Sequence, residues 1–422
     1  MSFWLEVPGR NQLTPEQQKI VALPSEQHLL VLGPPGSGKT VTLLYRADKL
    51  RTESQVSDER FLIVVFTNVL TRYIKSILER LNIPVSSVRT FDSWCFRYHT
   101  DNIESVPRLG NNQPDFEKIR KNVKNHLERR KPPKLYHFLL IDEGQDLDEN
   151  AFKIATFISQ HVTVFGDDKQ QLYDAGISMD KVERVLSPVR QKTRKVHLLY
   201  GFRCTKFITH LASEFIDAPE EKLNFLQQHL EAEGAKQQPV LYLAKDQEDE
   251  MACLIENIRV RLDKTERLAI LVPTSKLVPQ LVKSLSDAGL DVETTAKITQ
   301  RHGLDCATVN FSSPKMKIIP FPSAKGLTLD SVFMPYLERE NFSDEFTTER
   351  IRKWIFVGIS RTTNWIYFSG REGKILFYEK FARNETEGYL QINRHHEYQR
   401  TLPENTDSDP TIDDDSSLID LF

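Results

Sequence analysis

The stretch Val31–Thr40, Val-Leu-Gly-Pro-Pro-Gly-Ser-Gly-Lys-Thr, constrains the fold more than any other part of the chain. The apolar run Leu29–Leu32 has the length of a buried strand, and the pattern Val41–Leu50 that follows the glycines fits a helix. A glycine-rich turn between a strand and a helix lets backbone N–H groups converge on phosphate oxygens. The sequence therefore predicts an α/β protein with a nucleoside-triphosphate site.

Each residue type in this turn has a defined task in such a site. Lys39 is expected to neutralise the β- and γ-phosphates, and the Thr40 hydroxyl to bind Mg²⁺. The residues expected to surround the phosphates are Gly33, Pro34, Pro35, Gly36, Ser37 and Gly38. Upstream, Thr14 and Gln17 form a capping box that starts a helix over Pro15–Ala22. The Gln17 amide either contacts an adenine edge or only caps this helix, and both interpretations stay open.

A second motif follows the apolar run Phe138–Ile141, which ends in two adjacent carboxylates. This arrangement allows Asp142 to bind Mg²⁺ while Glu143 orients and deprotonates a water molecule. A later strand, Val162–Phe165, leads into Gln170, which is positioned to sense a γ-phosphate.

Strand and helix patterns alternate between these two motifs. The predicted strands Phe61–Phe66 and Val88–Asp92 are each followed by helix-compatible sequence, which indicates a parallel sheet with ligands at the carboxyl ends of its strands. Four residues are expected at these strand ends, as turn residues or as ligand contacts: Thr67, Asn68, Thr90 and Phe91.

The bulk composition is that of a globular protein with 422 residues, 39% hydrophobic and 27% charged, enough for two or three domains. No apolar run approaches the length of a membrane span, and the four cysteines have neither zinc-site nor disulfide spacing. We therefore expect no membrane association and a cytoplasmic location, or a nuclear one in a eukaryote.

The net charge of −3 hides an uneven distribution of charge. Seven carboxylates follow Arg400, so the first 400 residues carry a net charge of +4. A basic, polar segment at about residues 101–134 interrupts the strand–helix rhythm as an insertion, either as a solvated helix face or as a surface for a phosphate backbone.

Nine segments, in this order, resemble the motifs of the superfamily 1A DNA helicases of the UvrD/Rep/PcrA type. The Gln-Asp ending of Asp142–Asp146 is much more specific than a generic acidic pair. The segments are Leu13–Gln17, Gly33–Thr40, Phe66–Asn68, Thr90–Phe91, Asp142–Asp146, Gly166–Gln170 with Tyr173, Leu199–Arg203, Ser323–Leu327 and Val357–Arg361.

This resemblance implies two RecA-like lobes with parallel central sheets, ATP and Mg²⁺ between them, and ATP hydrolysis coupled to 3′ to 5′ movement on single-stranded DNA. Arg203 and Arg361 would reach the γ-phosphate from the second lobe, Gly326 would contact the nucleotide, and Phe202 would stack on adenine. Contacts to DNA are implied for Phe66, Thr67, Asn68, Thr90, Phe91, Tyr173 and Ser323.

The chain departs from the family pattern at several positions. Asp92 stands where the family usually has His, and Pro320, Pro322 and Thr328 replace the Thr, His and Glu around the Lys-Gly-Leu motif. After Tyr173, the family's aromatic-Arg-Gly turn is replaced by Ala175-Gly176-Ile177. These changes keep open an alternative function: a regulatory or sensor ATPase that partners a nuclease in a phage-defence or mobile-element system and unwinds little. RNA as the substrate is a weaker third interpretation.

The expected division is a first lobe at residues 1–200, a second lobe at 201–385 with a small helical insertion at about 219–236, and a linker and disordered tail at 386–422. The chain is thus a minimal form that lacks the large second-lobe insertion. The tail segment Leu418–Phe422 resembles the sliding-clamp-binding pentapeptide in its Asp-Leu-Phe. It is expected to dock on a partner protein, to remain a solvated tail, or to fold back over the basic body as a nucleic-acid mimic.

Overall fold

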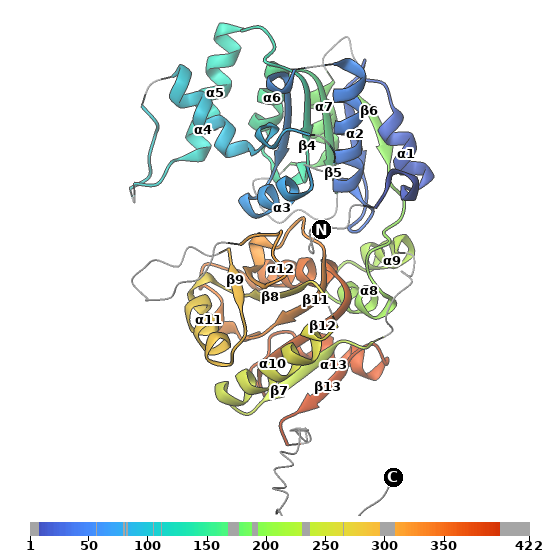
Figure 1. The fold of residues 1–422 in the computed structure, drawn as a ribbon, viewed down its shortest axis with the longest axis vertical. Coiled ribbons are helices and arrows are strands. Elements are labelled where there is room, and N and C mark those ends of the chain that lie inside the picture. Colours follow the sequence, from blue (N-terminus) through green and yellow to red (C-terminus); the bar gives the residue numbers. More distant parts are fainter. Residues whose placement is uncertain are drawn as a thin grey trace, which may run out of the picture.

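Two α/β lobes lie one above the other along the long axis of the molecule (Figure 1). The computed structural model describes residues 8–55, 57–78, 81, 83–103, 105–110, 112–167, 177–187, 193–229, 237–264, 266–295 and 309–396. Within this part of the chain, no helix combines the length and the apolar character that crossing a membrane requires.

Lobe 1 is organised around a six-stranded sheet in which every pair of neighbouring strands is parallel. In spatial order its strands are β3 (Val88–Thr90), β2 (Phe61–Val65), β4 (Tyr136–Ile141), β5 (Ser159–Gly166), β1 (Leu29–Leu32) and β6 (Arg194–His197). Its helices are α1 (Pro15–Ala22), α2 (Lys39–Ser54), α3 (Asn68–Leu78), α4 (Phe91–Asn102), α5 (Phe116–Arg130), α6 (Glu149–Ile158) and α7 (Met179–Leu186).

Lobe 2 has a seven-stranded sheet that is also parallel throughout. Its strands, in spatial order, are β13 (Gln391–Arg394), β7 (Val240–Ala244), β12 (Thr362–Arg371), β11 (Leu329–Met334), β8 (Leu268–Val272), β10 (Met316–Pro320) and β9 (Val292–Thr294). Its helices are α8 (Lys206–Ser213), α9 (Pro219–Gln228), α10 (Gln247–Leu262), α11 (Val278–Asp287), α12 (Thr348–Ser360) and α13 (Tyr378–Thr386). The predicted fold class, two RecA-like α/β lobes with parallel sheets, is confirmed.

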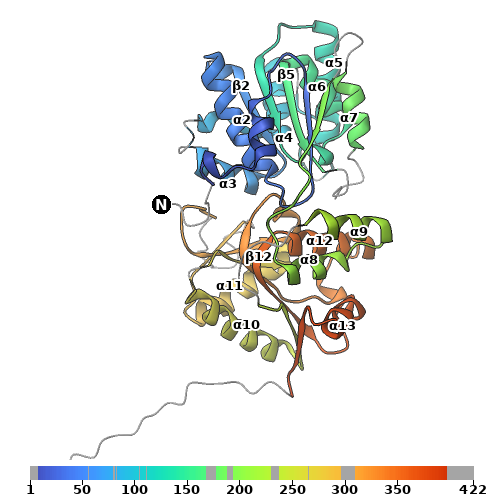
Figure 2. The ribbon, with the colours of Figure 1, turned by 90° about the vertical axis from the view of Figure 1, so that its right-hand side faces the viewer.

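Helices cover both faces of each sheet, as the two perpendicular views show (Figures 1 and 2). One apolar cluster continues from lobe 1 into lobe 2, because Leu70 and Tyr73 of α3 belong to the same cluster as Phe311 and Leu327. The rings of Tyr73 and Phe311 meet edge to face with centroids 5.3 Å apart. The two lobes are therefore held together by apolar packing as well as by polar contacts.

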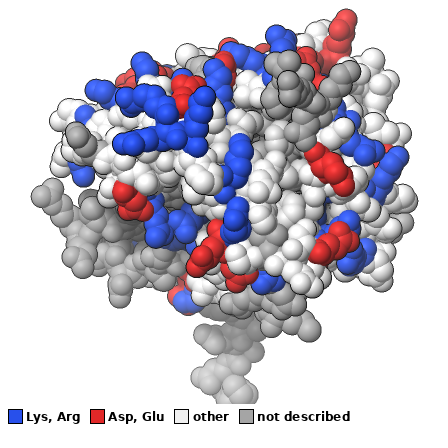
Figure 3. Space-filling model, turned by 90° about the horizontal axis from the view of Figure 1, so that it is seen from above, with Lys and Arg blue, Asp and Glu red and all other residues white. Residues whose placement is uncertain are grey.

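The basic insertion contains α5, whose Ile119, Val123 and Leu127 recur at every fourth position and are fully buried. This spacing places one apolar stripe on the lobe and leaves the basic side chains of the helix outside. In the view from the lobe 1 end, Lys and Arg side chains gather toward the upper left of the surface (Figure 3). Both interpretations of this insertion, a solvated face and a phosphate contact, remain compatible with this placement.

The expected end of lobe 2 at residue 385 is too early, because β13 belongs to the lobe 2 sheet and extends to Arg394. The sequence Gln391–Arg394 carries no strand signal, since Ile392 is its single apolar residue and its single buried one. Residues 397–422, including Leu418–Phe422, lie outside the described residues. In the expected insertion at 219–236, α9 covers the first ten residues and 230–236 are not described.

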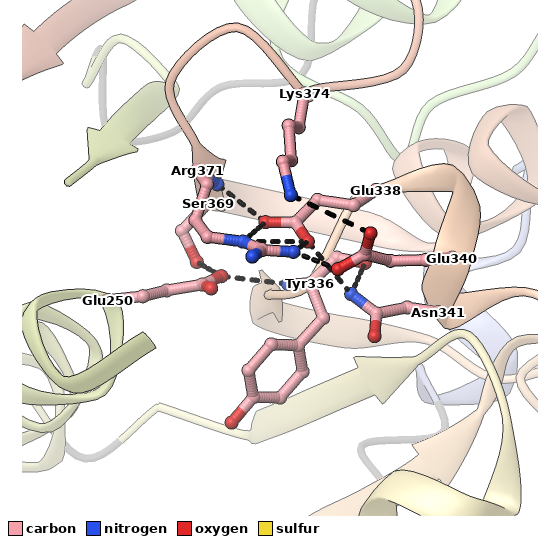
Figure 4. Close-up of polar contacts among 8 residues, drawn as sticks. All are labelled: Glu250, Tyr336, Glu338, Glu340, Asn341, Ser369, Arg371 and Lys374. Atoms are coloured by element: carbon pink, nitrogen blue, oxygen red, sulfur yellow. Dashed lines mark hydrogen bonds and ion pairs between the residues drawn. The ribbon is translucent and has the colours of Figure 1, made fainter. Parts of the chain in front are cut away.

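A buried polar network lies at the carboxyl edge of the lobe 2 sheet (Figure 4). One oxygen of Glu250 accepts hydrogen bonds from the backbone N–H of Tyr336, at 2.9 Å, and from the hydroxyl of Ser369, at 2.7 Å. Beside it, Glu338 accepts from the Arg371 backbone N–H at 2.7 Å and from its Nε at 3.0 Å. Burial raises the pKa of the Glu250 carboxyl to about 7. The network joins α10, the segment after β11 and the end of β12.

Candidate functional site

A pocket of about 550 Å³ lies between the two lobes and is lined by side chains from both. The predicted site residues that line it are Gln17, Pro35, Gly36, Gly38, Lys39, Thr40, Glu143, Phe202, Arg203, Gly326 and Arg361. Its volume suits a mononucleotide with its phosphates.

The turn after β1 depends on two glycines with left-handed backbone conformations, Gly36 at φ 74° and Gly38 at φ 79°. A Cβ atom on Gly38 would lie 2.4 Å from the Gln17 Nε2, and one on Gly36 would lie 2.7 Å from the Arg203 Cβ. Both positions therefore favour glycine for the backbone angle, and Gly36 also allows the close approach of Arg203 from lobe 2.

The Lys39 ammonium lies inside the turn, where it donates to the carbonyls of Gly33 and Pro34 at 2.6 and 3.0 Å. Its Nζ also lies 3.9 Å from a carboxylate oxygen of Asp167, at the end of β5. Burial lowers the pKa of Lys39, while Asp167 acts in the opposite direction. An anion bound in the turn would compete with these neutral carbonyls for the ammonium.

The Gln17 side chain has a structural role here. Its Oε1 accepts from the Thr14 backbone N–H at 3.0 Å, which completes the predicted capping box, and its Nε2 donates to the Ser37 carbonyl at 3.0 Å. The amide thus links α1 to the glycine-rich turn. Contact with an adenine edge stays a prediction.

Thr40 and Asp142, the two expected metal ligands, lie next to each other. The Thr40 hydroxyl donates to Asp142 Oδ2 at 2.7 Å. Burial and the adjacent Glu143 carboxylate raise the pKa of Asp142. A hydroxyl and a carboxylate are oxygen donors of the kind Mg²⁺ prefers, so the donor set fits the ion.

Glu143 follows β4 in a left-handed conformation, with φ 52°, which turns its side chain into the pocket. Gln145 donates to its Oε2 at 2.6 Å and accepts at its own Oε1 from the Asp167 backbone N–H at 3.1 Å. Although burial raises the pKa of Glu143, the nearby cations of Lys325 and Arg361 outweigh it and lower the pKa overall. The carboxylate is thus charged and held in one orientation.

Two arginines enter the pocket from the lobe 2 side. Arg203 precedes α8 and donates to the Ser360 carbonyl at 3.3 Å, while Arg361 directly follows α12 and is buried. Burial, together with the neighbouring Arg361, lowers the pKa of Arg203 to about 10. Two guanidinium groups that repel each other in a buried site are stabilised when an anion binds between them.

Lys325, to which the motifs assign no role, makes an ion pair across the two lobes. Its Nζ lies 2.5 Å from Asp146 Oδ2 and 3.8 Å from Glu143 Oε2, and all three side chains are buried. Both residues belong to recognised motifs, but nothing in their spacing predicts that they meet. The contact links the segment of the proposed base directly to lobe 2.

Tyr73 of α3 also lines the pocket and was missed, because it belongs to the apolar stripe of that helix. Its hydroxyl forms a hydrogen bond with Thr328 of lobe 2. Thr328 is the position where the family usually has Glu, so this contact between the lobes lies at a position where the chain departs from the family pattern.

The residues expected to contact nucleic acid have different surroundings in the structure. Thr67 and Thr90 are helix caps, because their hydroxyls accept from the backbone N–H groups of Leu70 and Ser93 at 3.0 and 3.2 Å. Phe66 and Phe91, in contrast, line a pocket of about 180 Å³ at the carboxyl ends of β2 and β3. Asn68 is exposed and Ser323 is partly exposed. Gln170 and Tyr173 lie outside the described residues.

Asp92, which stands where the family usually has His, forms an ion pair with Arg120 of α5 at 2.5 Å. The same guanidinium donates to Asp148 at 2.9 Å. These three side chains line the 180 Å³ pocket together with Phe66 and Phe91. The replacement of His by Asp is therefore matched by a basic partner from the insertion.

Residues 13–134 match the UvrD/REP helicase N-terminal domain family. No curated protein matches the chain. Among solved structures, the C-terminal domain of a possible DNA helicase from Lactobacillus plantarum WCFS1 is similar over 46% of this chain and 98% of its own length, at 18% sequence identity and a TM-score of 0.33. The resemblance inferred from the motifs is confirmed for residues 13–134, which are similar to the N-terminal domain of the UvrD/REP helicases.

Proposed function

We propose that this chain is an ATP-dependent DNA translocase or helicase whose ATP hydrolysis is stimulated by single-stranded DNA. The observation that carries the proposal is the composition of the 550 Å³ pocket between the lobes. Lobe 1 supplies the phosphate-binding turn, the Thr40–Asp142 pair and Glu143, and the other lobe supplies two arginines. Such a division makes hydrolysis depend on closure of the lobes, because the arginines reach the γ-phosphate only then.

In this mechanism Mg²⁺, held by Thr40 and Asp142, would supply charge neutralisation at the β- and γ-phosphates. Lys39 would leave the carbonyls of its own turn for the phosphates, and Glu143 would take a proton from the attacking water. Arg203 and Arg361 would stabilise charge that develops on the phosphate oxygens. Gln170 is proposed as the γ-phosphate sensor at the end of β5.

We propose that single-stranded DNA crosses the carboxyl edge of lobe 1, where Phe66 and Phe91 line a pocket of nucleobase size. Tyr173 and Ser323 are proposed as further contacts, and movement is proposed to run 3′ to 5′ by resemblance to the family. With DNA as its substrate, the chain would act in the cytoplasm.

The proposal is tested by measuring the ATPase rate with single-stranded DNA, with duplex DNA, with RNA and without nucleic acid. A rise with single-stranded DNA is the expected result, and an unchanged rate would show that the chain is not a DNA-driven translocase. RNA stimulation alone would assign an RNA substrate.

A second candidate function is a regulatory or sensor ATPase that partners a nuclease and unwinds little. The contact between Tyr73 and Thr328 favours it, because it ties the lobes together at a position where the chain departs from the family pattern. Strand displacement on a 3′-tailed duplex by the purified chain separates the two functions: unwinding supports the helicase, and ATP hydrolysis without unwinding supports the regulator.

We also propose that Leu418–Phe422 docks on a sliding clamp. Deletion of Ser417–Phe422 should abolish co-purification with the clamp while leaving the ATPase rate unchanged. Equal co-purification of the truncated and full chains would remove this proposal.

A further inference from the structure

A group of metal-binding side chains lies at the end of lobe 2 that faces away from the nucleotide pocket. Arg361 of the pocket immediately precedes β12, and Glu372 immediately follows this ten-residue strand. The length of the strand separates the two positions by about 33 Å. The ends of β7 and β13 lie at the same edge, at the bottom of the molecule in Figure 1.

The sheet register brings two of these side chains together. β7 runs between β12 and β13, with Ala244 paired to Arg371 on one side and Leu243 paired to Arg394 on the other. Glu372 lies one residue beyond the end of β7, and its backbone N–H donates to the Ala244 carbonyl at 2.8 Å. His395 lies level with Ala244, the last residue of β7, and its backbone N–H donates to the Leu243 carbonyl at 3.1 Å. The next side chains of the two strands therefore converge over the end of β7.

Three donor atoms meet there, one each from Glu372, His395 and His396, and all lie within 4.8 Å of one another. The Glu372 Oε2 and the His395 Nδ1 are 3.5 Å apart. Ligands bound about 2.0–2.1 Å from an ion in tetrahedral geometry lie about 3.4 Å apart, so this pair already has the spacing of two ligands. The third, His396, is exposed, and its ring meets that of His395 edge to face with centroids 5.2 Å apart.

The charged side chains around Glu372 leave its carboxylate available to a cation. Arg371, the residue before Glu372, is engaged by Glu338 and Glu340 (Figure 4). Arg394 lies 3.8 Å from the Oε1 of Glu372, on the opposite oxygen from the one that faces His395. A guanidinium at this distance weakens binding of a second cation but does not occupy the Oε2 position.

We propose that Glu372, His395 and His396 form a binding site for a divalent transition-metal ion, with Zn²⁺ as the natural occupant. Two imidazoles and one carboxylate suit Zn²⁺, Co²⁺ and Ni²⁺ better than Mg²⁺ or Ca²⁺, and water fills the remaining coordination positions. The bound ion ties the end of β12 to the end of β13. Among the strands that the structure describes, β13 lies at the sheet edge and pairs with β7 alone, so the ion would fasten an edge strand of lobe 2.

The test uses the full chain without an affinity tag, freed of metal by chelation. Co²⁺ is titrated and followed by its visible absorption, and Zn²⁺ is titrated by calorimetry. The matched variants are H395N, H396N and E372Q. The control is H197N, which removes an exposed histidine of lobe 1. We expect one ion per chain with a dissociation constant on the order of micromolar, weakened about tenfold or more by each site variant and unchanged in H197N.

A second measurement keeps the test independent of other metal sites on the chain, including Thr40 and Asp142. Zn²⁺ should slow amide hydrogen exchange in peptides spanning β13 in the wild type and leave it unchanged in the H395N/H396N double variant. Metal-free wild type and variants should melt at the same temperature, since the replaced side chains are exposed or half-buried. Equal Co²⁺ and Zn²⁺ binding by wild type and the double variant, or no Zn²⁺-dependent protection of β13, would overturn the proposal.

Discussion

Replacement of Glu250 by Gln should change how the stability of lobe 2 depends on pH. One Glu250 oxygen accepts two hydrogen bonds, and the other is buried with no hydrogen-bond partner among the described residues. Burial raises the pKa of this carboxyl from its ordinary 4.5 to about 7. At about 1.4 kcal/mol per pH unit, this difference corresponds to on the order of 3 kcal/mol.

The direction of this pH dependence follows from which state, folded or unfolded, keeps the Glu250 proton. Between pH 4.5 and pH 7 the folded protein keeps Glu250 protonated while the unfolded chain has released the proton, so this group makes folding less favourable as pH rises. Below pH 4.5 both states are protonated, and above pH 7 the loss is complete. Between pH 5 and pH 8 the wild type should lose about 2.5 kcal/mol of unfolding free energy through this residue.

Glu250→Gln removes this loss because the amide does not titrate. The buried amide N–H groups of the variant cost about 1–3 kcal/mol, but equally at both pH values, so they cancel in the comparison. The assay is urea unfolding at pH 5 and pH 8, with hydrogen exchange in β7 and β12 to assign the change to lobe 2. Glu248→Gln, at an exposed position in the same helix, is the matched control and should show no pH-dependent difference. If the difference between wild type and Glu250→Gln is the same at both pH values, Glu250 is not a buried titrating group.

Three further predictions concern the pocket between the lobes. Glu143→Gln should retain ATP binding but lower the hydrolysis rate about 100-fold or more, because the amide cannot accept the proton. A nucleotide-binding assay and single-turnover hydrolysis measure these two quantities, and an unchanged hydrolysis rate would exclude Glu143 as the base. Lys39→Ala should weaken both binding and hydrolysis, which the same two measurements check, and unchanged binding would place the phosphates elsewhere. Lys325→Met should destabilise the chain by about 3–5 kcal/mol, because Asp146 loses a buried counter-ion. Thermal melting should show this loss of stability, and the double variant Lys325→Met/Asp146→Leu should recover it. Equal melting temperatures of Lys325→Met and wild type would mean that the ion pair does not contribute to stability.

Much of lobe 1 could be predicted from the sequence because its signals are local. The strand Leu29–Leu32 and the helix Pro15–Ala22 with its capping box have the expected bounds. The strand expected over Val88–Asp92 ends at Thr90, because Phe91 already begins α4. Each depends on the periodicity or capping chemistry of a few consecutive residues, which acts without reference to the rest of the fold. Thr67 and Thr90 show where such local reasoning fails. The sequence around a threonine at a strand end does not distinguish a hydroxyl that caps a helix from one that binds a ligand.

Other features depended on the tertiary structure, because they join residues far apart in the chain. The sequence alone shows the glycine-rich turn and the acidic pair after β4, which together predict an α/β protein with a nucleotide site. The packing of the lobes decided that Lys325 meets Asp146 and that Tyr73 meets Thr328. Sheet register likewise decided that Glu372 and His395 converge over the end of β7. A local pattern sets which backbone conformation a segment prefers, whereas these contacts arise only when separate segments bury a common surface.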